Sequence, residues 1–379
     1  MPLSNDVAVV QPILAARVFL QLPPELTELI VRRLYPNEAA TSFRLVNKAA
    51  AAQFLRPEHT TVRLSQPVPP HAFAAHWLAP GATRGLTLER RKQLLILTAA
   101  SGVVANLEVA AQAAGLELSQ AACDILPVIA AAGNLDSCQW LLGRLRHLSS
   151  GVLEASLEAA ARQGHRRICE LLLGVSLAPG KGPRSLAMAA QGAVRSGHLQ
   201  LADWLLQRVG APDLSRLRHP SFAVAMAEGC DLAALQRRVD SGGWGQELSA
   251  VPSYKEGAPA AAAGSPTPDW AAKVEWLEAQ GCPRSADATD RAAALPDDAE
   301  ALAHLTWLRG RGCPLGVLAV QAAAKAGNVA ALQYLLAEVP LEAQPLEDAL
   351  FVLGAAAAGG HLAVLQGPAR RRLEARRPQ

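Results

Sequence analysis

The stretch QGHRRICELLLG, residues 163–174, places a Gly-His pair ahead of a short segment with helical spacing of apolar residues. Ile168, Leu172 and Leu173 recur at the interval that lines one face of a helix. An Ala-rich stretch, LEASLEAAARQ, precedes the pair at 153–163. A glycine between two such segments can end the first helix in the left-handed conformation, where a side chain costs energy. The stretch therefore predicts two short helices joined by a glycine turn.

The same pattern recurs along the chain with a period near 32 residues. The anchoring glycines are Gly102, Gly133, Gly164, Gly197, Gly229, Gly327 and Gly360. The gaps between them are 31, 31, 33, 32, 98 and 33 residues, and 98 is about three periods. Because a short helix pair cannot bury its apolar face alone, we predict that the pairs stack into an all-α solenoid of about eight or nine units.

Two related octapeptides, WLEAQGCP at 276–283 and WLRGRGCP at 307–314, fill the long gap. Five of their eight positions are identical, and they stand 31 residues apart. If each Trp follows its turn by seven residues, as Trp140 and Trp204 do, the missing turns fall at Asp269 and Glu300. The octapeptides therefore indicate two repeat units that lack the Gly-His turn.

The cysteine in each octapeptide suggests an alternative, a paired metal or redox site. Structural zinc usually takes four ligands, two of them in a close CxxC or HxxxH pair. Cys282 and Cys313 each stand alone, and His304 has no ordinary pairing with Cys313, nine residues on. We interpret Gly281 and Gly312 as the ends of second helices, and predict that the two sulfurs lie one repeat spacing apart, roughly 10 Å.

The segment SGGWGQELSAVPSYKEGAPAAAAGSPTPDW, residues 241–270, departs from the pattern because it is rich in Gly, Pro, Ser and Ala. This composition is typical of a linker. We expect a low-complexity insertion over 241–268 that replaces most of one first helix and separates repeats at 91–240 from repeats at 269–367. The final residues, 368–379, carry five arginines in RRRLEARRPQ and are interpreted as a solvated basic tail.

The repeat resembles the ankyrin repeat over about residues 91–366. That family carries Gly-His between its helices and Leu-Leu at the end of the second. Matching pairs are Gly164–His165, Gly197–His198, Gly360–His361, Leu141–Leu142, Leu172–Leu173, Leu205–Leu206 and Leu335–Leu336. The family's Thr-Pro-Leu-His opening of the first helix is missing throughout. HEAT and armadillo repeats fit the period less well, because their units are longer, about 40–47 residues. The resemblance implies a non-enzymatic solenoid that binds a protein partner through residues that remain unknown.

The N-terminal stretch LQLPPELTELIVRRLYPNEAATSFRLVNKAAAAQF, residues 20–54, has its own helical pattern. Pro23 and Pro24 mark a predicted helix start, and an apolar helical stripe is formed by Leu22, Leu26, Leu29, Ile30 and Leu34. Asn37 is expected to cap a second helix. We predict a helical module over 20–56, preceded by a tail at 1–19 and followed by a connector at 57–90.

This module resembles an F-box, which binds the adaptor subunit of a cullin-RING ubiquitin ligase. The resemblance rests on Leu-Pro-x-Glu-Leu from Leu22, an Ile and a Leu at four-residue steps, and Arg-Leu-Val-Asn-Lys at 44–48; alanines occupy 49–52, where the family usually has a Trp. It implies an adaptor-binding set of Leu22, Pro23, Glu25, Leu26, Ile30, Leu34, Leu45 and Val46. The alternative is a helical hairpin that only caps the first repeat, as terminal repeats require.

Composition narrows the class of protein. Half of the 379 residues are hydrophobic but only 4% are aromatic, which suits closely packed Ala-rich helices better than a β-sandwich. A dispersed net charge of +3 does not favour nucleic-acid binding. The N-terminus is too polar for a signal peptide, and the six cysteines contain no CxxC. We expect a monomer of the cytoplasm or nucleus with no membrane segment.

No enzyme signature appears, because GxSxG, P-loop, GxGxxG and HExxH patterns are all missing. The histidines that follow the glycines are interpreted as turn hydrogen-bonding groups. Asp297 and Asp298 are interpreted as the N-cap and first turn of a helix over 299–308. The four tryptophans at the shared position, Trp140, Trp204, Trp276 and Trp307, are interpreted as core packing. We therefore expect no catalytic, cofactor-binding or metal-binding residues.

Overall fold

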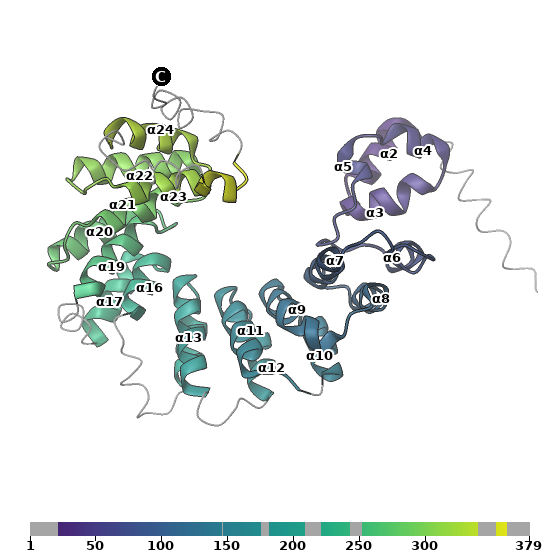
Figure 1. Cartoon of the computed structure of the whole chain (residues 1–379), viewed down its shortest axis with the longest axis horizontal. Helices are drawn as coiled ribbons and strands as arrows, with labels where there is room; N and C mark the ends of the chain where they lie inside the picture. Colours follow the sequence, from purple (N-terminus) through teal and green to yellow (C-terminus); the bar gives the residue numbers. More distant parts are fainter. Residues whose placement is uncertain are drawn as a thin grey trace, which may run out of the picture. The chain divides into compact units, whose positions relative to one another are not determined.

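A computed structural model describes residues 22–145, 147–175, 182–208, 221–242, 252–339 and 354–361. All regular elements of these residues are helices, which confirms the all-α class. The chain divides into two compact units, Met1–Pro179 and Gly180–Gln379 (Figure 1). Within the described part, no helix has both the length and the apolar character needed to cross a membrane. The predicted tails at 1–19 and 368–379 lie outside the described residues.

The first unit begins with a small helical module. Its elements are α2 (Pro24–Val31), α3 (Pro36–Thr41), the 3-10 turn η1 (Phe43–Leu45), α4 (Lys48–Gln53) and α5 (Pro57–Thr60). Proline opens α2, α3 and α5, where its fixed φ suits the first helical turn. Val31, Ala39 and Phe54 form a buried core, against which Leu34 and Phe43 pack. The module therefore has a hydrophobic core of its own.

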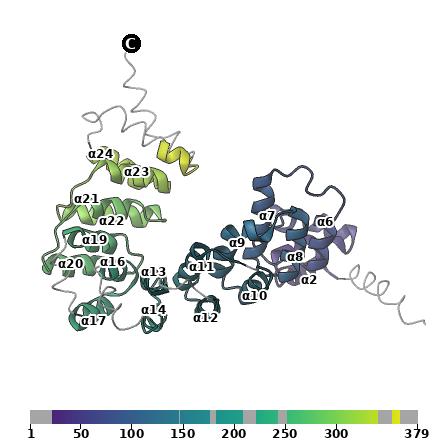
Figure 2. The ribbon, with the colours of Figure 1, turned by 60° about the horizontal axis from the view of Figure 1, so that its bottom comes forward.

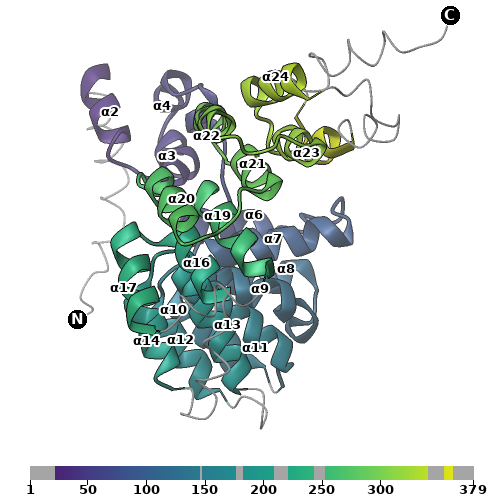
Figure 3. The ribbon, with the colours of Figure 1, turned by 90° about the vertical axis from the view of Figure 1, so that its left-hand side faces the viewer.

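Helix pairs follow the module in the same unit. The helices are α6 (Pro70–Trp77), α7 (Leu88–Ala100), α8 (Val104–Ala114), α9 (Leu118–Ala132), α10 (Leu135–Arg144), α11 (Ser150–Arg162) and α12 (Arg166–Gly174). The first helices α7, α9 and α11 pack in sequence, and the second helices α8, α10 and α12 form a second row (Figures 1 and 3). Alanines such as Ala99, Ala130 and Ala160 are fully buried between them, so the helices can approach closely.

The segment 57–90, expected as a connector, contains helical segments. It contains α5, α6 and the start of α7, and α6 packs against α8. Pro57 and Pro70 each stand at the start of a helix, where the missing N–H of proline costs nothing. The repeat region therefore carries an additional helix ahead of its first regular pair.

The second unit consists of five helix pairs in the described part. They are α13 (Gly182–Arg195) with α14 (Leu199–Leu206), α16 (Ser221–Gly229) with α17 (Leu232–Gly242), α19 (Pro252–Ala263) with α20 (Trp270–Ala279), α21 (Ala286–Ala293) with α22 (Asp298–Gly310), and α23 (Val317–Ala326) with α24 (Val329–Glu338). The first helices α13, α16, α19, α21 and α23 pack one on the next (Figure 2). Residues 354–358 are helical as well.

The predicted insertion at 241–268 is corrected by α19. This helix packs between α16 and α21 and supplies the first helix of a full pair. Ala258 and the alanines at 260–263 are buried there, so a run that resembled a linker is the apolar face of a tightly stacked helix. The part of the insertion at 243–251 lies outside the described residues.

Six of the seven anchoring glycines have the expected left-handed backbone, and Gly229 does not. At Gly133 φ is +79°, and the amide N–H groups of Gly133 and Asn134 bond back to α9 at Ala130 and Ile129. This pair of bonds is a Schellman motif, which ends a helix. Gly229 is required for a different reason, because a Cβ there would collide with the carbonyl group of Arg195.

Candidate functional sites

Helix α2 of the N-terminal module turns its largest apolar side chains toward solvent. Leu26, Leu29 and Ile30 are 45%, 56% and 39% exposed, whereas Thr27 and Val31 are buried. The buried side is held to α4, since the Thr27 hydroxyl lies 3.0 Å from Gln53 Oε1 and Gln53 Nε2 donates to the Pro24 carbonyl at 3.1 Å. The stripe Leu26, Leu29 and Ile30 is therefore not part of the module's core, and it is called the α2 face below.

Most of the predicted adaptor-binding residues lie at the surface. Leu45 and Val46 are 75% and 49% exposed. Pro23 and Glu25 are also exposed, while Leu22 is half-buried. Leu34 differs from the prediction because it packs against the core around Val31. Since α2 ends at Val31, Leu34 lies beyond the helix and cannot continue its stripe.

Asn37 attaches the module to the chain that leads into the repeats. Its side chain is fully buried. Nδ2 lies 2.7 Å from the carbonyl oxygen of Arg63 and 3.1 Å from those of Gln66 and Pro67, and Oδ1 accepts from the Arg63 N–H at 2.8 Å. The prediction that Asn37 caps a helix is wrong, because Pro36 already opens α3 and the residue before it, Tyr35, is the N-cap.

The next step of this attachment comes from the repeats themselves. Asn106 of α8 is buried and donates from Nδ2 to the Val68 carbonyl at 2.8 Å. Asn37 and Asn106 thus hold successive parts of the loop between α5 and α6. The module is joined to the repeats through backbone carbonyls, and the α2 face takes no part in these hydrogen bonds.

In several helix pairs, a polar side chain bonds to the end of the first helix in the preceding pair. Asn134 Nδ2 donates to the carbonyls of Ala99 and Ala100 at 3.3 and 3.1 Å. His165 Nε2 lies 3.1 Å from the Ala131 carbonyl oxygen. Asn328 Nδ2 donates to Ala293 and Leu295 at 3.0 and 2.8 Å. The histidines after the glycines were interpreted as hydrogen-bonding groups of their own turns. His165 instead bonds to the preceding helix pair.

Lys273 donates hydrogen bonds to the end of α16, the first helix of the preceding pair. Among the described residues, it is the one charged group that bonds to a helix end in this way. It is fully buried, and Nζ donates to the Ala227 and Cys230 carbonyls at 2.7 and 2.9 Å and to Ser265 Oγ at 2.7 Å. Burial lowers its pKa to about 8. Three acceptors match the three N–H groups of an ammonium, so the buried charge is fully hydrogen-bonded.

A serine hydroxyl beside a lysine of lowered pKa can also serve as a nucleophile and its base. Here Ser265 is 1% exposed and Lys273 is 0% exposed, which leaves no approach for a substrate. The Ser265 hydroxyl already donates to the Glu228 carbonyl, and Lys273 donates to Ser265. We therefore interpret the pair as a structural cap of α16.

The predicted roles of the paired aspartates are also structural. Asp297 caps α22 by accepting from the Glu300 N–H at 2.9 Å, as the sequence predicted. Asp298 accepts from the N–H groups of Ala330 and Ala331 at 2.8 and 3.0 Å, so it caps α24 in the following pair. Both carboxylates are committed to helix N-termini, where negative charge is favourable.

Cys282 and Cys313 occupy equivalent positions after α20 and α22. Each is a free, buried thiol whose N–H bonds five residues back, to Leu277 at 3.1 Å and to Leu308 at 3.0 Å. The glycine before each cysteine has φ of +85°. The prediction that these glycines end second helices is confirmed. Across the described residues, no three His, Cys, Asp or Glu side chains are grouped to hold a metal ion.

Three of the four repeated tryptophans carry an arginine from the next helical turn on the ring. The guanidinium carbons of Arg144, Arg208 and Arg311 lie 4.4, 3.8 and 4.8 Å from the ring centroids of Trp140, Trp204 and Trp307. These arginines were not singled out by the sequence pattern. Their spacing of four residues from each Trp is the signal that could have found them.

No protein-family model, no curated protein and no solved structure matches the chain. Its function must therefore be inferred from its own residues and their geometry.

Proposed function

We propose that this chain is a non-enzymatic recognition protein. An ankyrin-like solenoid binds a protein partner, and the F-box-like module docks the adaptor subunit of a cullin-RING ubiquitin ligase. The observation that carries the proposal is the α2 face, an exposed apolar stripe on a module that already has a separate core. An exposed apolar stripe of this kind is typical of an interaction site.

The α2 face also favours docking over a purely capping role. A cap would turn its apolar side toward the first helix pair, because covering that pair is its task. Here the connection to the repeats is made by Asn37 and Asn106, through backbone carbonyls. Covering the half-exposed Leu26, Leu29 and Ile30 with a partner would contribute about 1 kcal/mol for each side chain. A bound adaptor offers that gain.

The ankyrin-like assignment is supported by the agreement between period and structure. Helix pairs recur at about 32 residues, their first helices stack, and a glycine ends the first helix in most pairs. Stacked pairs of this kind bind partners through exposed side chains of first helices and loops, which differ from one repeat to the next. A protein partner is therefore proposed for the repeats.

The test is co-purification of the full chain with the ligase adaptor, comparing wild type with the double variant Leu26→Asp, Ile30→Asp. Leu318→Asp is the matched control, because Leu318 is an exposed leucine on α23 in the other unit. We expect the wild type and the control to retain the adaptor and the double variant to lose it, with all three melting at the same temperature.

Two results would contradict the proposal. An adaptor that binds none of the proteins, or binds the double variant as well as the wild type, would remove the ligase role. A double variant that melts at a lower temperature would show that the α2 face stabilises the fold, as the capping alternative requires.

A further inference from the structure

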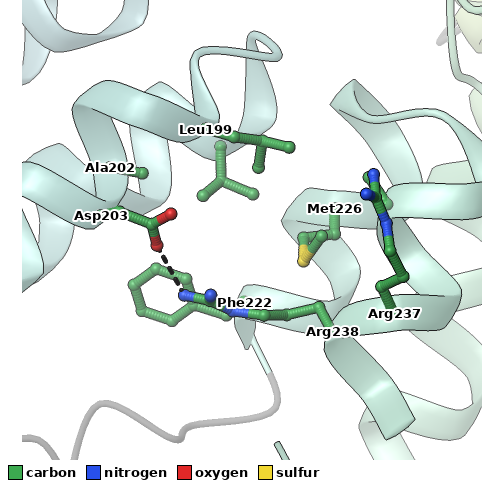
Figure 4. A pocket seen from close by; sticks show the side chains of 9 residues that line it. Leu199, Ala202, Asp203, Phe222, Met226, Arg237 and Arg238 are labelled. Carbon is green, nitrogen blue, oxygen red and sulfur yellow. Dashed lines mark hydrogen bonds and ion pairs between the residues drawn. The ribbon is translucent and has the colours of Figure 1, made fainter. Parts of the chain in front are cut away.

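We propose that a groove between α14, α16 and α17 binds a segment of a partner protein in which a large apolar side chain stands next to Asp or Glu. The inference rests on the proposed recognition role and names the kind of segment recognised. The lining residues are Val194, Leu199, Ala202, Asp203, Phe222, Met226, Ala234, Arg237 and Arg238 (Figure 4).

The floor of the groove is apolar. Phe222 and Met226 from α16 and Ala202 from α14 lie there with little exposed surface, and Leu199 is half-buried at the side. Met fits varied side chains because it is unbranched and polarizable. Such a floor can accept a leucine, methionine or phenylalanine side chain, because moving apolar surface out of water is favourable.

The size of the groove favours side chains of a peptide over a small-molecule ligand. Its volume is about 280 Å³. Sites for drug-sized ligands typically measure about 300–1,000 Å³ and enclose most of the ligand. A space at or below the lower end of that range fits one or two side chains, with the rest of the segment lying on the surface.

Two arginines of α17 give the rim its charge. Arg237 is exposed, its Nε donates to the Ala233 carbonyl at 3.2 Å, and no carboxylate among the described residues pairs with it. Arg238 extends toward α14, where it bonds to Asp203 at 2.9 Å (Figure 4). The rim thus carries two guanidinium groups and one carboxylate, so it is complementary to a further negative charge.

The Asp203–Arg238 ion pair shows how such a carboxylate would bind. Both side chains are partly exposed, at 50% and 41%, so the pair contributes little stability to the fold. A carboxylate of the partner segment can take the place of Asp203 on Arg238, or bind Arg237 directly. Asp203 is therefore an internal competitor of the bound segment, and its removal should tighten binding.

The experiment uses a displayed library of random twelve-residue peptides selected on the full chain, with counter-selection on the double variant Arg237→Glu, Arg238→Glu. We expect the retained peptides to share a Leu, Met or Phe beside an acidic residue. The selected peptide is then labelled with fluorescein, and its affinity is measured by anisotropy. Affinity should fall with added salt, since the contact is between charges.

Asp203→Asn is the decisive variant, because a merely structural role of the rim would not make it bind more tightly. We expect its affinity to rise about twofold to fivefold, the range that loss of an exposed ion pair allows. Asp240→Asn is the matched control, as Asp240 is an exposed residue of α17 that does not line the groove. Asp203→Asn also keeps the proposal testable if the double arginine variant fails to fold.

The proposal is overturned if no peptide is enriched, if the enriched peptides lack an acidic residue, or if Asp203→Asn and Asp240→Asn behave alike. Failure here is distinct from failure of the ligase role, because the variants Leu26→Asp and Ile30→Asp lie in the other unit and should leave peptide affinity unchanged.

Discussion

Lys273 Nζ lies 2.7 Å from the carbonyl oxygen of Ala227, so a lysine of one helix pair closes the end of a helix in the preceding pair. Elsewhere Asn134, His165 and Asn328 do this from the residue just before a second helix. The pairs α19/α20 and α21/α22 lack the Gly-His turn, and in both pairs the donor lies inside the second helix. In α20 the donor is Lys273. In α22 it is His304, whose Nδ1 lies 2.8 Å from the Ala263 carbonyl oxygen. The hydrogen bond is kept although the turn sequence is lost.

The buried ammonium of Lys273 makes stability depend on pH. Burial lowers its folded pKa to about 8 from an ordinary 10.5, so between these values the unfolded chain binds a proton that the folded chain has released. The free energy of unfolding of wild type relative to Lys273→Met should therefore rise with pH over this window, by up to about 3 kcal/mol.

Urea unfolding at pH 7.5, 9 and 10 checks this expectation. The exposed Lys325→Met on α23 is the control for the loss of one lysine charge. A difference between wild type and Lys273→Met that stays constant, or that falls as pH rises, would show that the ammonium is not penalised by burial.

The donors at the helix ends should be exchangeable between pairs. Asn328 is buried, and its Nδ2 serves the Ala293 and Leu295 carbonyls. Asn328→Leu leaves these acceptors unsatisfied and should lower the free energy of unfolding by about 1–3 kcal/mol. Asn328→His should recover a substantial part of the loss, because His165 makes the corresponding bond in another pair. Chemical denaturation of wild type, Asn328→Leu and Asn328→His measures the three free energies of unfolding. Equal stability of the Leu and His variants would contradict the donor role.

Much of the fold could be predicted because each helix pair carries its own local pattern. The glycine period located the turns, and Gly281, Gly312 and Asp297 end or begin helices as predicted. These residues act on backbone groups only a few positions away, so their spacing records their role. The α2 stripe was found for the same reason, since three of its residues share one side of a single helix.

The errors came from residues whose partners are distant in sequence. Asn37 has the type and position of an N-cap, yet its partners are carbonyls 26 to 30 residues on. The alanines of α19 have a linker composition until α16 and α21 bury them. Glycine is required at position 229 because a Cβ there would collide with the Arg195 carbonyl group, and not because the backbone has a positive φ. Composition and spacing describe the local chain, and these roles depend on neighbours that only the fold supplies.

Thiol reactivity should separate one cysteine from the other five. Cys123 is exposed, whereas burial raises the pKa of Cys138 and Cys169 to about 12 and that of Cys230 to about 11. Burial also raises the pKa of Cys282 and Cys313. Since the thiolate is the reactive form, a disulfide reagent at pH 8 should modify one thiol quickly.

Cys123→Ser should abolish this fast phase, and urea should expose the remaining thiols in both proteins. The same measurement tests the metal alternative for Cys282 and Cys313. If a chelator speeds the reaction of either cysteine or lowers the melting temperature, the two residues hold a metal and the structural interpretation of the octapeptides is wrong.

The close contact between Gly133 and His165 should cost more to disturb than a left-handed glycine alone. Gly115 and Gly133 both have positive φ, +62° and +79°, but a Cβ at Gly115 meets no atom within 4 Å, whereas one at Gly133 would lie 2.6 Å from His165 Cε1. Gly115→Ala should cost about 1–2 kcal/mol for the conformation alone. Gly133→Ala should cost more, because it also displaces the ring that bonds to Ala131.

Combining each glycine change with His165→Ala isolates the contribution of the His165 ring to the free energy of unfolding. In the His165→Ala background, the cost of Gly133→Ala should shrink, whereas the cost of Gly115→Ala should stay the same. Equal behaviour at the two glycines would show that the packing of His165 against the turn contributes nothing.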